Sequence, residues 1–259
     1  MFKGGTSLSK SYHVIERFSE DIDLTFLGME ESDKVCDKTI KKIEKIMTVG
    51  ADIEKIDAER SNRSKSMFVW FGDKSNRIKL EIGSSVRPDP FSKKSLKTYI
   101  QEFLEEHNGE EDIARFKLEE ITLNVLNIER TFVDKLMSVK RHAVCGTIEK
   151  KVRHVYDVSR LFDLPEIKAF LEDKTELKRL IGITKDTDSF YLEKRNISQE
   201  YDPKGAYDFE AWKHLLNDQV CSTYENLHKD LLYTDEPQNF EMALSCFEKI
   251  SELLKEIGE

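Results

Sequence analysis

Residues 4–24 read GGTSLSKSYHVIERFSEDIDL, and this stretch decides the fold. The glycine pair at its start, followed by Thr6 and Ser7, predicts a turn that leads into a helix capped by one of the two hydroxyls. From Asp21 to Phe26 polar and apolar residues alternate, which predicts a strand with one apolar face. The stretch therefore predicts a helix followed by a strand whose other face carries carboxylates.

The side chains of Asp21 and Asp23 leave this strand from one face because they are two residues apart. Two carboxylates this close repel each other unless a cation lies between them, and Mg²⁺ accepts oxygen ligands of this kind. Glu81 lies on the polar face of another predicted strand, residues 77–82. If the two strands are neighbours, the three carboxylates could hold two metal ions for an in-line phosphoryl or nucleotidyl transfer. The alternative is that all three are solvated strand-face charges, with Glu81 paired to Lys79.

The glycine pair Gly4 and Gly5 suggests a phosphate cradle. Glycine lets the backbone approach a phosphate closely, and a helix N-terminus favours negative charge. A cradle just before a metal-binding pair of carboxylates fits a nucleoside triphosphate, because one part holds its tail and the other its reacting phosphorus. The alternative is an ordinary turn.

The rest of the chain changes from mixed α and β to helical. Apolar periodicity predicts a helix over 31–49 and a hairpin of strands 67–71 and 77–82. After an irregular stretch, further helices are predicted over 129–144, 148–163, 166–172, 205–233 and 237–257. These patterns predict an α+β protein with a mixed domain over 1–128 and a helical bundle over 129–259.

Composition restricts the class of protein. The 259 residues are 39% hydrophobic and 35% charged, enough to form a core. No apolar run approaches the roughly 20 residues that cross a bilayer, and no signal peptide is visible, so we expect a cytoplasmic protein without a membrane partner. Cys36, Cys145, Cys221 and Cys246 form no CxxC pair and are expected to be free thiols.

The net charge of −9 argues against a protein that coats nucleic acid non-specifically. One basic island nevertheless lies within 130–160, where eight Lys and Arg residues stand against three acids. We expect it to be either an RNA-facing surface or a solvated helix face.

Several motifs resemble those of a known family. Residues 3–8 (KGGTSL) and 17–24 (RFSEDIDL) resemble the signature of the AbiEii/AbiGii-type toxin nucleotidyltransferases, a branch of the polymerase-beta-like superfamily. The resemblance continues in residues 80–82 (LEI), 131–136 (TFVDKL) and 153–161 (RHVYDVSRL), and more loosely in the C-terminal helices. It thus spans most of the chain.

This resemblance implies a polymerase-beta-like nucleotidyltransferase domain, a mixed sheet flanked by helices, followed by the helical bundle. It also implies roles for individual residues. The triphosphate would be held by Gly4, Gly5, Thr6 and Ser7, and the metal ions by Asp21, Asp23 and Glu81, with Glu81 as the third carboxylate or as a base for the attacking hydroxyl.

The resemblance implies further roles in the second half. Lys135 would neutralise the triphosphate as a point charge, and Asp157 would be a polar anchor near the site. The alternative for both is a surface charge on a helix. Arg17 and Ser19 match the motif and are expected to brace the strand, and His154 is given no chemical role. The active cleft is expected between the two halves.

By this resemblance we expect a Mg²⁺-dependent enzyme that transfers a nucleotide from a nucleoside triphosphate to an acceptor hydroxyl. The acceptor would be RNA, with the 3′ end of tRNA as the first candidate, and the context a toxin–antitoxin or abortive-infection system with a cognate antitoxin protein. Two alternatives stay open. One is a nucleotide- or protein-binding module on an inactive transferase fold, and the other is transfer to a small molecule or a protein side chain.

Two departures from the family pattern bear on these expectations. The family usually has a helix and a strand before the Lys-Gly-Gly, whereas here the chain begins at Met1-Phe2, so we expect the entry strand to be almost absent. Either the start is truncated or another segment covers the strand edge, which would be a liability if left unpaired. The third carboxylate is Glu81 rather than an aspartate, which adds one methylene at that position.

Overall fold

The computed structural model describes residues 1–19, 21–193 and 200–259, so Glu20 of the quoted motif lies outside the described residues. The chain forms two compact units, each treated by itself. Unit 1 comprises Met1–His13, Ser19–Ser84 and Pro88–Asn127, and unit 2 comprises Val14–Phe18, Ser85–Arg87 and Ile128–Glu259. The chain therefore passes into unit 2 for five residues between the glycine pair and the aspartates.

Unit 1 is built on a mixed sheet of seven strands in the order β3-β4-β5-β2-β1-β7-β6. The strands are β1 (Phe2–Lys3), β2 (Asp21–Thr25), β3 (Asp52–Lys55), β4 (Ser64–Trp70), β5 (Ile78–Gly83), β6 (Phe91–Leu96) and β7 (Ile121–Leu126). The β2–β5 and β1–β7 pairs are parallel, and the other neighbours are antiparallel. The predicted strand at Asp21 and the predicted hairpin of β4 and β5 are confirmed.

The short entry strand at the start of the chain does not leave an exposed strand edge. β1 has only two residues, but it lies inside the sheet, antiparallel to β2 and parallel to β7. The Met1 ammonium donates to the Thr25 carbonyl at 2.6 Å, and the Thr25 amide donates to the Met1 carbonyl at 2.9 Å. The sheet ends instead at β3 and β6.

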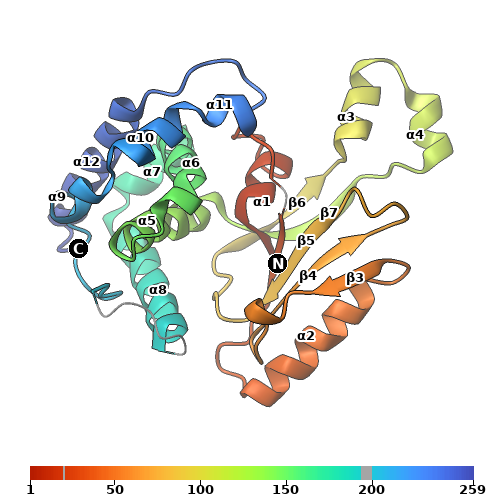
Figure 1. Cartoon of the computed structure of the whole chain (residues 1–259), viewed down its shortest axis with the longest axis horizontal. Coiled ribbons are helices and arrows are strands. Elements are labelled where there is room, and N and C mark those ends of the chain that lie inside the picture. The colour runs from red at the N-terminus through yellow and green to blue at the C-terminus, as the bar shows by residue number, and fades with distance from the viewer. Residues whose placement is uncertain (20, 194–199) are drawn as a thin grey trace. The chain divides into compact units, whose positions relative to one another are not determined.

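Helix α2 (Asp33–Met47) covers one face of the sheet (Figure 1). The Ser32 hydroxyl caps it by accepting from the Val35 amide. Its Ile40 packs in a core cluster with Met67, Val69, Leu80 and Ile82, all fully or almost fully buried. The apolar alternation of β4 and β5 thus faces α2, which leaves their intervening residues on the opposite face.

Helix α1 (Gly4–Lys10) begins directly after β1, with Lys3 as its N-cap and no side-chain cap. The expected cap by Thr6 or Ser7 is therefore wrong. The Thr6 hydroxyl donates to the Asp21 carbonyl and the Ser7 hydroxyl to the Gly4 carbonyl, so both bonds hold the start of α1 in place.

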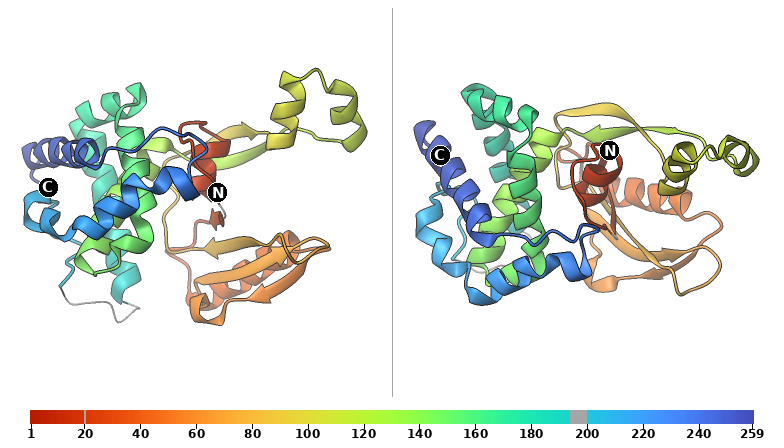
Figure 2. Two further views of the ribbon diagram at one scale, coloured as in Figure 1. Left: turned by 45° about the horizontal axis from the view of Figure 1, so that its top comes forward. Right: turned by 90° about the horizontal axis from the view of Figure 1, so that it is seen from above.

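Between β6 and β7 the chain forms α3 (Tyr99–Glu106) and α4 (Glu110–Phe116), which extend beyond the ends of these strands (Figure 2). No element was predicted over 91–126, so β6, α3, α4 and β7 were all missed. Lys10 of α1 forms an ion pair with Glu102 of α3 at 2.7 Å and lies over the Tyr99 ring, so α3 is fastened to the helix that follows the glycines.

Unit 2 is helical, as predicted. Its elements are α5 (Ile128–Val144), η2 (Ile148–Lys151), α6 (Val152–Phe162), α7 (Pro165–Glu172), α8 (Lys174–Glu193), α9 (Phe209–Trp212), η3 (Lys213–Leu215), α10 (Asp218–Glu225), α11 (Leu227–Asp230) and α12 (Phe240–Glu256). Helix α5 packs against α6, α7, α8 and α9. The single helix predicted over 205–233 is wrong, because Asn217 caps a new helix by accepting from the Val220 amide.

No helix of the described chain is long and apolar enough to cross a membrane. The four cysteines are free thiols, as predicted.

Candidate functional site

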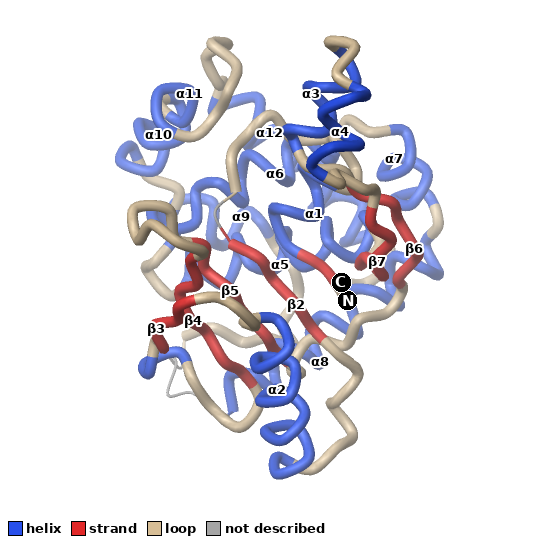
Figure 3. The backbone as a smooth tube through the Cα atoms, turned by 90° about the vertical axis from the view of Figure 1, so that its right-hand side faces the viewer, coloured by secondary structure: helices blue, strands red, loops and turns tan. Residues whose placement is uncertain are grey.

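Two rows of side chains cross the sheet face opposite α2. The first runs Lys3 (β1), Asp23 (β2), Glu81 (β5) and Ser66 (β4), and the second runs Asp21 (β2), Lys79 (β5), Phe68 (β4) and Glu54 (β3). Strands β2, β5, β4 and β3 lie side by side (Figure 3). Strands β2 and β5 are therefore neighbours, as the hypothesis of a site with three carboxylates requires. Asp23 and Glu81 are direct partners in this parallel pair.

Gly4 is the point at which the glycine pair meets the aspartates. Its φ is +80°, in the left-handed region that favours glycine. A Cβ at this position would lie 2.1 Å from Oδ2 of Asp23, so the carboxylate lies directly against the Gly4 backbone. The Lys3 ammonium is 3.8 Å from Oδ1 of the same carboxylate. Only glycine leaves room for Asp23 at this place.

The other members of the predicted cradle support this contact. The hydroxyl of Thr6 bonds the backbone of Asp21, and that of Ser7 is completely buried and bonds the Gly4 carbonyl at 2.8 Å. Ser7 thus has its hydroxyl occupied, and its carbonyl accepts from the Ser11 amide at 2.9 Å, so a role for Ser7 in binding the triphosphate stays a prediction.

Lys79 lies between two carboxylates. Its ammonium is 2.5 Å from Oε1 of Glu81 and 2.8 Å from Glu59, at the end of η1 (Asp57–Glu59). Burial disfavours its charge, but hydrogen bonds to Glu59 and Glu81 raise the pKa of Lys79 above its ordinary value. The pairing of Glu81 with Lys79 that the sequence suggested is therefore present.

The donor set fits a divalent cation in part. Asp21 and Asp23 present carboxylates from one strand face, which suits Mg²⁺. Oε1 of Glu81 is taken by Lys79, so a metal-ligand role for Glu81 requires this ion pair to open or to be shared. Within the ranges that the structure describes, no group of three or more His, Cys, Asp or Glu side chains is placed to hold a metal ion.

Asp157 and Lys135 lie together in unit 2, and neither is a surface charge. Asp157 is completely buried, receives two hydrogen bonds of 2.7 Å from the Arg17 guanidinium, and lies 2.6 Å from the Lys135 ammonium. Burial alone would raise the pKa of this carboxyl, but the charges of Lys135 and Arg17 hold it below its usual range. Asp157 therefore fixes the positions of two cations.

Arg17 was expected to brace the strand, and instead it binds Asp157. Its side chain comes from the short segment Val14–Phe18, which the sequence analysis did not assign to the second unit. The Phe18 amide also bonds the Leu231 carbonyl at 3.0 Å, and the Tyr233 hydroxyl bonds the Ile15 carbonyl at 2.8 Å. The spacing of the residues within the motif gave no sign of these distant partners.

His154, which was given no chemical role, lies at 3.0 Å from the Ser138 hydroxyl through Nδ1. Burial, together with the charge of nearby Lys135, lowers the pKa of His154 well below its ordinary value. A neutral histidine at this position adds no further charge beside Lys135.

Half of the basic island does not form an RNA-facing surface, because its side chains are turned inward and paired. Four of its members bind partners within unit 2: Arg130 with Asp134, Lys135 with Asp157, Lys140 with the Ala206 carbonyl, and Arg141 with Asp188. Of the other four, Lys150 and Arg160 are exposed.

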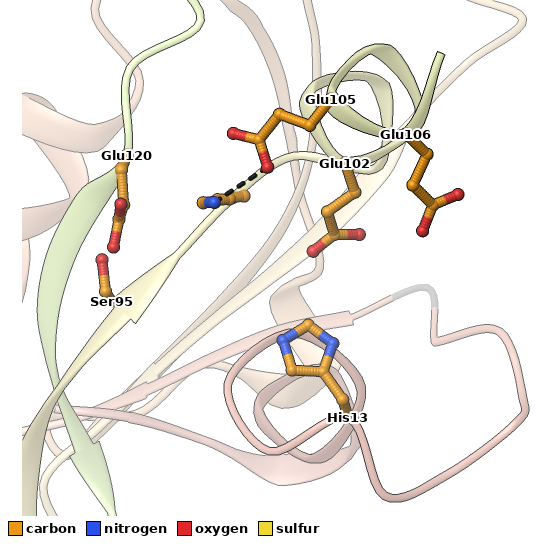
Figure 4. A pocket seen from close by; sticks show the side chains of 7 residues that line it. His13, Ser95, Glu102, Glu105, Glu106 and Glu120 are labelled. Carbon is orange, nitrogen blue, oxygen red and sulfur yellow. Dashed lines mark hydrogen bonds and ion pairs between the residues drawn. The ribbon is translucent and has the colours of Figure 1, made fainter. Parts of the chain in front are cut away.

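A pocket of about 570 Å³ lies elsewhere in unit 1 (Figure 4). It is lined by His13, Ser95, Lys97, Glu102, Glu105, Glu106 and Glu120. Lys97 is paired with Glu105 at 2.8 Å, which leaves an acidic lining. Such a lining repels a triphosphate, so this pocket is not the nucleotide site.

Sequence reasoning missed Lys3 as a member of the site. It named Lys79 only as a possible partner of Glu81, which the period of two places on the same face. For Lys3 the register between β1 and β2 was needed.

Residues 1–244 match the family model described as "Nucleotidyl transferase AbiEii toxin, Type IV TA system". The comparison with curated proteins returned no match. Among solved structures, MenT4, a nucleotidyltransferase toxin from Mycobacterium tuberculosis H37Rv, is 16% identical with a TM-score of 0.59, over 98% of this chain and 75% of that one.

A putative nucleotidyltransferase from H. pylori is 19% identical over 88% of both chains, with a TM-score of 0.36 that is too low to establish a shared fold. The likeness to MenT4 supports the fold alone, whereas the family model covers nearly the whole chain. The chain belongs to the AbiEii family of nucleotidyltransferase toxins of type IV toxin–antitoxin systems.

Proposed function

We propose that this toxin uses Mg²⁺ and a nucleoside triphosphate to place a nucleotide on a hydroxyl of an RNA acceptor, the 3′ end of a tRNA being the first candidate. The observation that carries the proposal is the contact of the Asp23 carboxylate with Gly4, beside Asp21 on the same strand face. This contact brings a backbone open to phosphate next to two potential metal ligands. The membership of a nucleotidyltransferase family supports the same chemistry.

In this reaction the acceptor oxygen bonds to the α-phosphorus, and the bond from that phosphorus to the bridging oxygen breaks. Pyrophosphate leaves with the bonding pair, and the acceptor proton passes to a base. A divalent cation on Asp21 and Asp23 would supply Lewis-acid stabilisation of the phosphoryl oxygens. Glu81 serves as the third carboxylate or as that base, and Lys79 holds it on the sheet face.

The triphosphate tail is assigned to Gly4, Gly5, Thr6 and Ser7, with the open backbone amides at the start of α1 as the donors. The close approach that glycine allows supports this assignment. Lys135 is assigned to neutralise negative charge of the triphosphate. Its pairing with the buried Asp157 supports a fixed ammonium at that position.

The family implies a nucleotide substrate and a cognate antitoxin. The tRNA acceptor and the cytoplasmic location stay predictions. The alternative of an inactive binding module was motivated by the expected loss of the entry strand, and the position of β1 inside the sheet removes that motive.

The test is an Asp21→Ala variant, with Asp52→Ala as the control. Asp52 is an exposed aspartate on β3 of the same sheet, and it has no place in the proposed site. Labelled nucleoside triphosphate, Mg²⁺ and total RNA are incubated with each protein. We expect Asp21→Ala to remain folded and lose transfer while Asp52→Ala retains it. Transfer by Asp21→Ala at the wild-type rate would overturn the metal site.

A further inference from the structure

Phe68 and Arg77 form a stacked pair on the sheet face that carries the aspartates. The Arg77 guanidinium lies over the Phe68 ring at 4.0 Å from its centroid. Phe68 is half-buried and Arg77 is exposed. Next to this pair, the Lys74 ammonium lies over the Trp70 ring at 5.0 Å. Two pairs of an aromatic ring and a cation are therefore formed between β4 and the turn that follows it.

The register places this pair close to the proposed metal ligands. Asp21 pairs with Lys79 and Lys79 pairs with Phe68, so the Phe68 ring lies two strands from Asp21 on the same face. Two strand spacings are about 10 Å. Met67 and Val69 point to the α2 side, which confirms that Phe68 faces away from the core.

The direction from which the acceptor approaches follows from the strand order, and this step rests on the proposed function. The triphosphate is assigned to the β1 side of the aspartates, at Gly4. In an in-line displacement the attacking oxygen approaches opposite the leaving pyrophosphate. In the order β4-β5-β2-β1, the opposite side is that of β5 and β4. The acceptor then passes over Glu81, Ser66 and Phe68.

We propose that the Phe68 and Arg77 pair is the stacking platform for an unpaired nucleobase at the end of the RNA acceptor. Bases of single-stranded RNA stack on aromatic rings and on arginine planes, and neighbouring cations contact the phosphates. Arg77 and Lys74 suit contacts with the phosphates, because neither has a carboxylate partner among the residues that the structure describes. A small-molecule or protein acceptor has no need of such a platform.

Two variants test the platform and one serves as a matched control. Phe68→Leu keeps an apolar side chain but removes the ring, and Arg77→Ala removes the guanidinium. Arg115 lies over the Phe116 ring at 5.1 Å on α4, so Arg115→Ala removes the same kind of pair elsewhere in unit 1. Phe68→Tyr retains a stacking ring and should rescue binding.

The first measurement is the affinity for a fluorescent single-stranded RNA oligonucleotide, read by anisotropy. Loss of one stacked base weakens binding by about 5- to 150-fold. We expect this loss in Phe68→Leu and Arg77→Ala, with Arg115→Ala and Phe68→Tyr close to wild type. In the transfer assay, the KM for RNA should rise by a similar factor while the KM for the nucleoside triphosphate stays unchanged.

The Asp21→Ala variant separates this inference from the proposed function. It should bind the oligonucleotide normally and transfer nothing. Undiminished RNA affinity in Phe68→Leu and Arg77→Ala overturns the platform even if wild-type transfer to RNA is observed. A wild-type protein that transfers nucleotide but binds no RNA overturns the platform and leaves nucleotidyl transfer intact. Transfer retained by Asp21→Ala overturns the metal site, and oligonucleotide binding then decides on the platform alone.

Discussion

Replacement of Gly4 by alanine tests the contact on which the proposed active site is built. Gly4 has a φ of +80°, and an added Cβ would lie 2.1 Å from Oδ2 of Asp23. Gly50 offers a matched control, because its φ is +77° and a Cβ there would meet nothing within 4 Å. The two substitutions share the backbone strain and differ in the clash.

The magnitudes follow from these distances. A non-glycine residue in the left-handed region costs about 1–2 kcal/mol, so both variants should lose this much stability. In Gly4→Ala the Asp23 carboxylate must also retreat from 2.1 Å to ordinary contact at 3.4 Å. A misplacement of about 1 Å costs on the order of 100-fold in rate. We expect this loss of transfer for Gly4→Ala and wild-type transfer for Gly50→Ala.

The assay combines thermal unfolding with nucleotide transfer by each purified variant at a temperature where both are folded. Equal stability losses with a selective loss of transfer in Gly4→Ala would support the contact. Transfer by folded Gly4→Ala within a few fold of wild type would refute the reasoning, and so would an equal loss in Gly50→Ala.

Three further predictions concern the buried ion cluster and the metal. Asp157→Asn should lose about 3–5 kcal/mol in urea unfolding, because it removes the buried carboxylate that both Arg17 and Lys135 bind. Glu16→Gln, which breaks an exposed pair with Arg160, should lose under about 1 kcal/mol. The folded pKa of Asp157 lies below its unfolded value, so its contribution to the free energy of unfolding should be complete above about pH 4 and lost as the pH falls through the folded pKa. A urea series from pH 6 to pH 2 in which Asp157→Asn loses as much stability in acid as wild type would contradict this prediction. Chelation of divalent cations should abolish transfer without shifting the unfolding midpoint, and Mg²⁺ should restore it, so transfer that survives dialysis against a chelator would exclude a metal on Asp21.

The elements with clear periodicity were predictable from sequence. The alternation from Asp21 to Phe26 produced β2, and the apolar residues of β4 and β5 produced their hairpin, because one face of each strand is buried against α2. The short or exposed elements were not predictable. β1 has two residues, too few to show a period, and β3 is exposed along its whole length.

The same distinction applies to the site. The period of two placed Asp21 and Asp23 on one face, and that placement is local. The pairing of Asp23 with Glu81 depends on the parallel contact of β2 with β5, which sequence spacing does not reveal. The binding of Arg17 to Asp157 joins residues 140 positions apart, and only the fold brings them together.

The most direct test of the central claim is to follow two labels in parallel. The protein is incubated with Mg²⁺, total RNA and each nucleoside triphosphate in turn, labelled at either the α- or the γ-phosphorus, and the RNA is resolved on a gel. Nucleotidyl transfer predicts that the α-label moves onto a discrete RNA band and that the γ-label leaves in pyrophosphate. A γ-label on RNA, or unlabelled RNA despite bound triphosphate, would contradict the account.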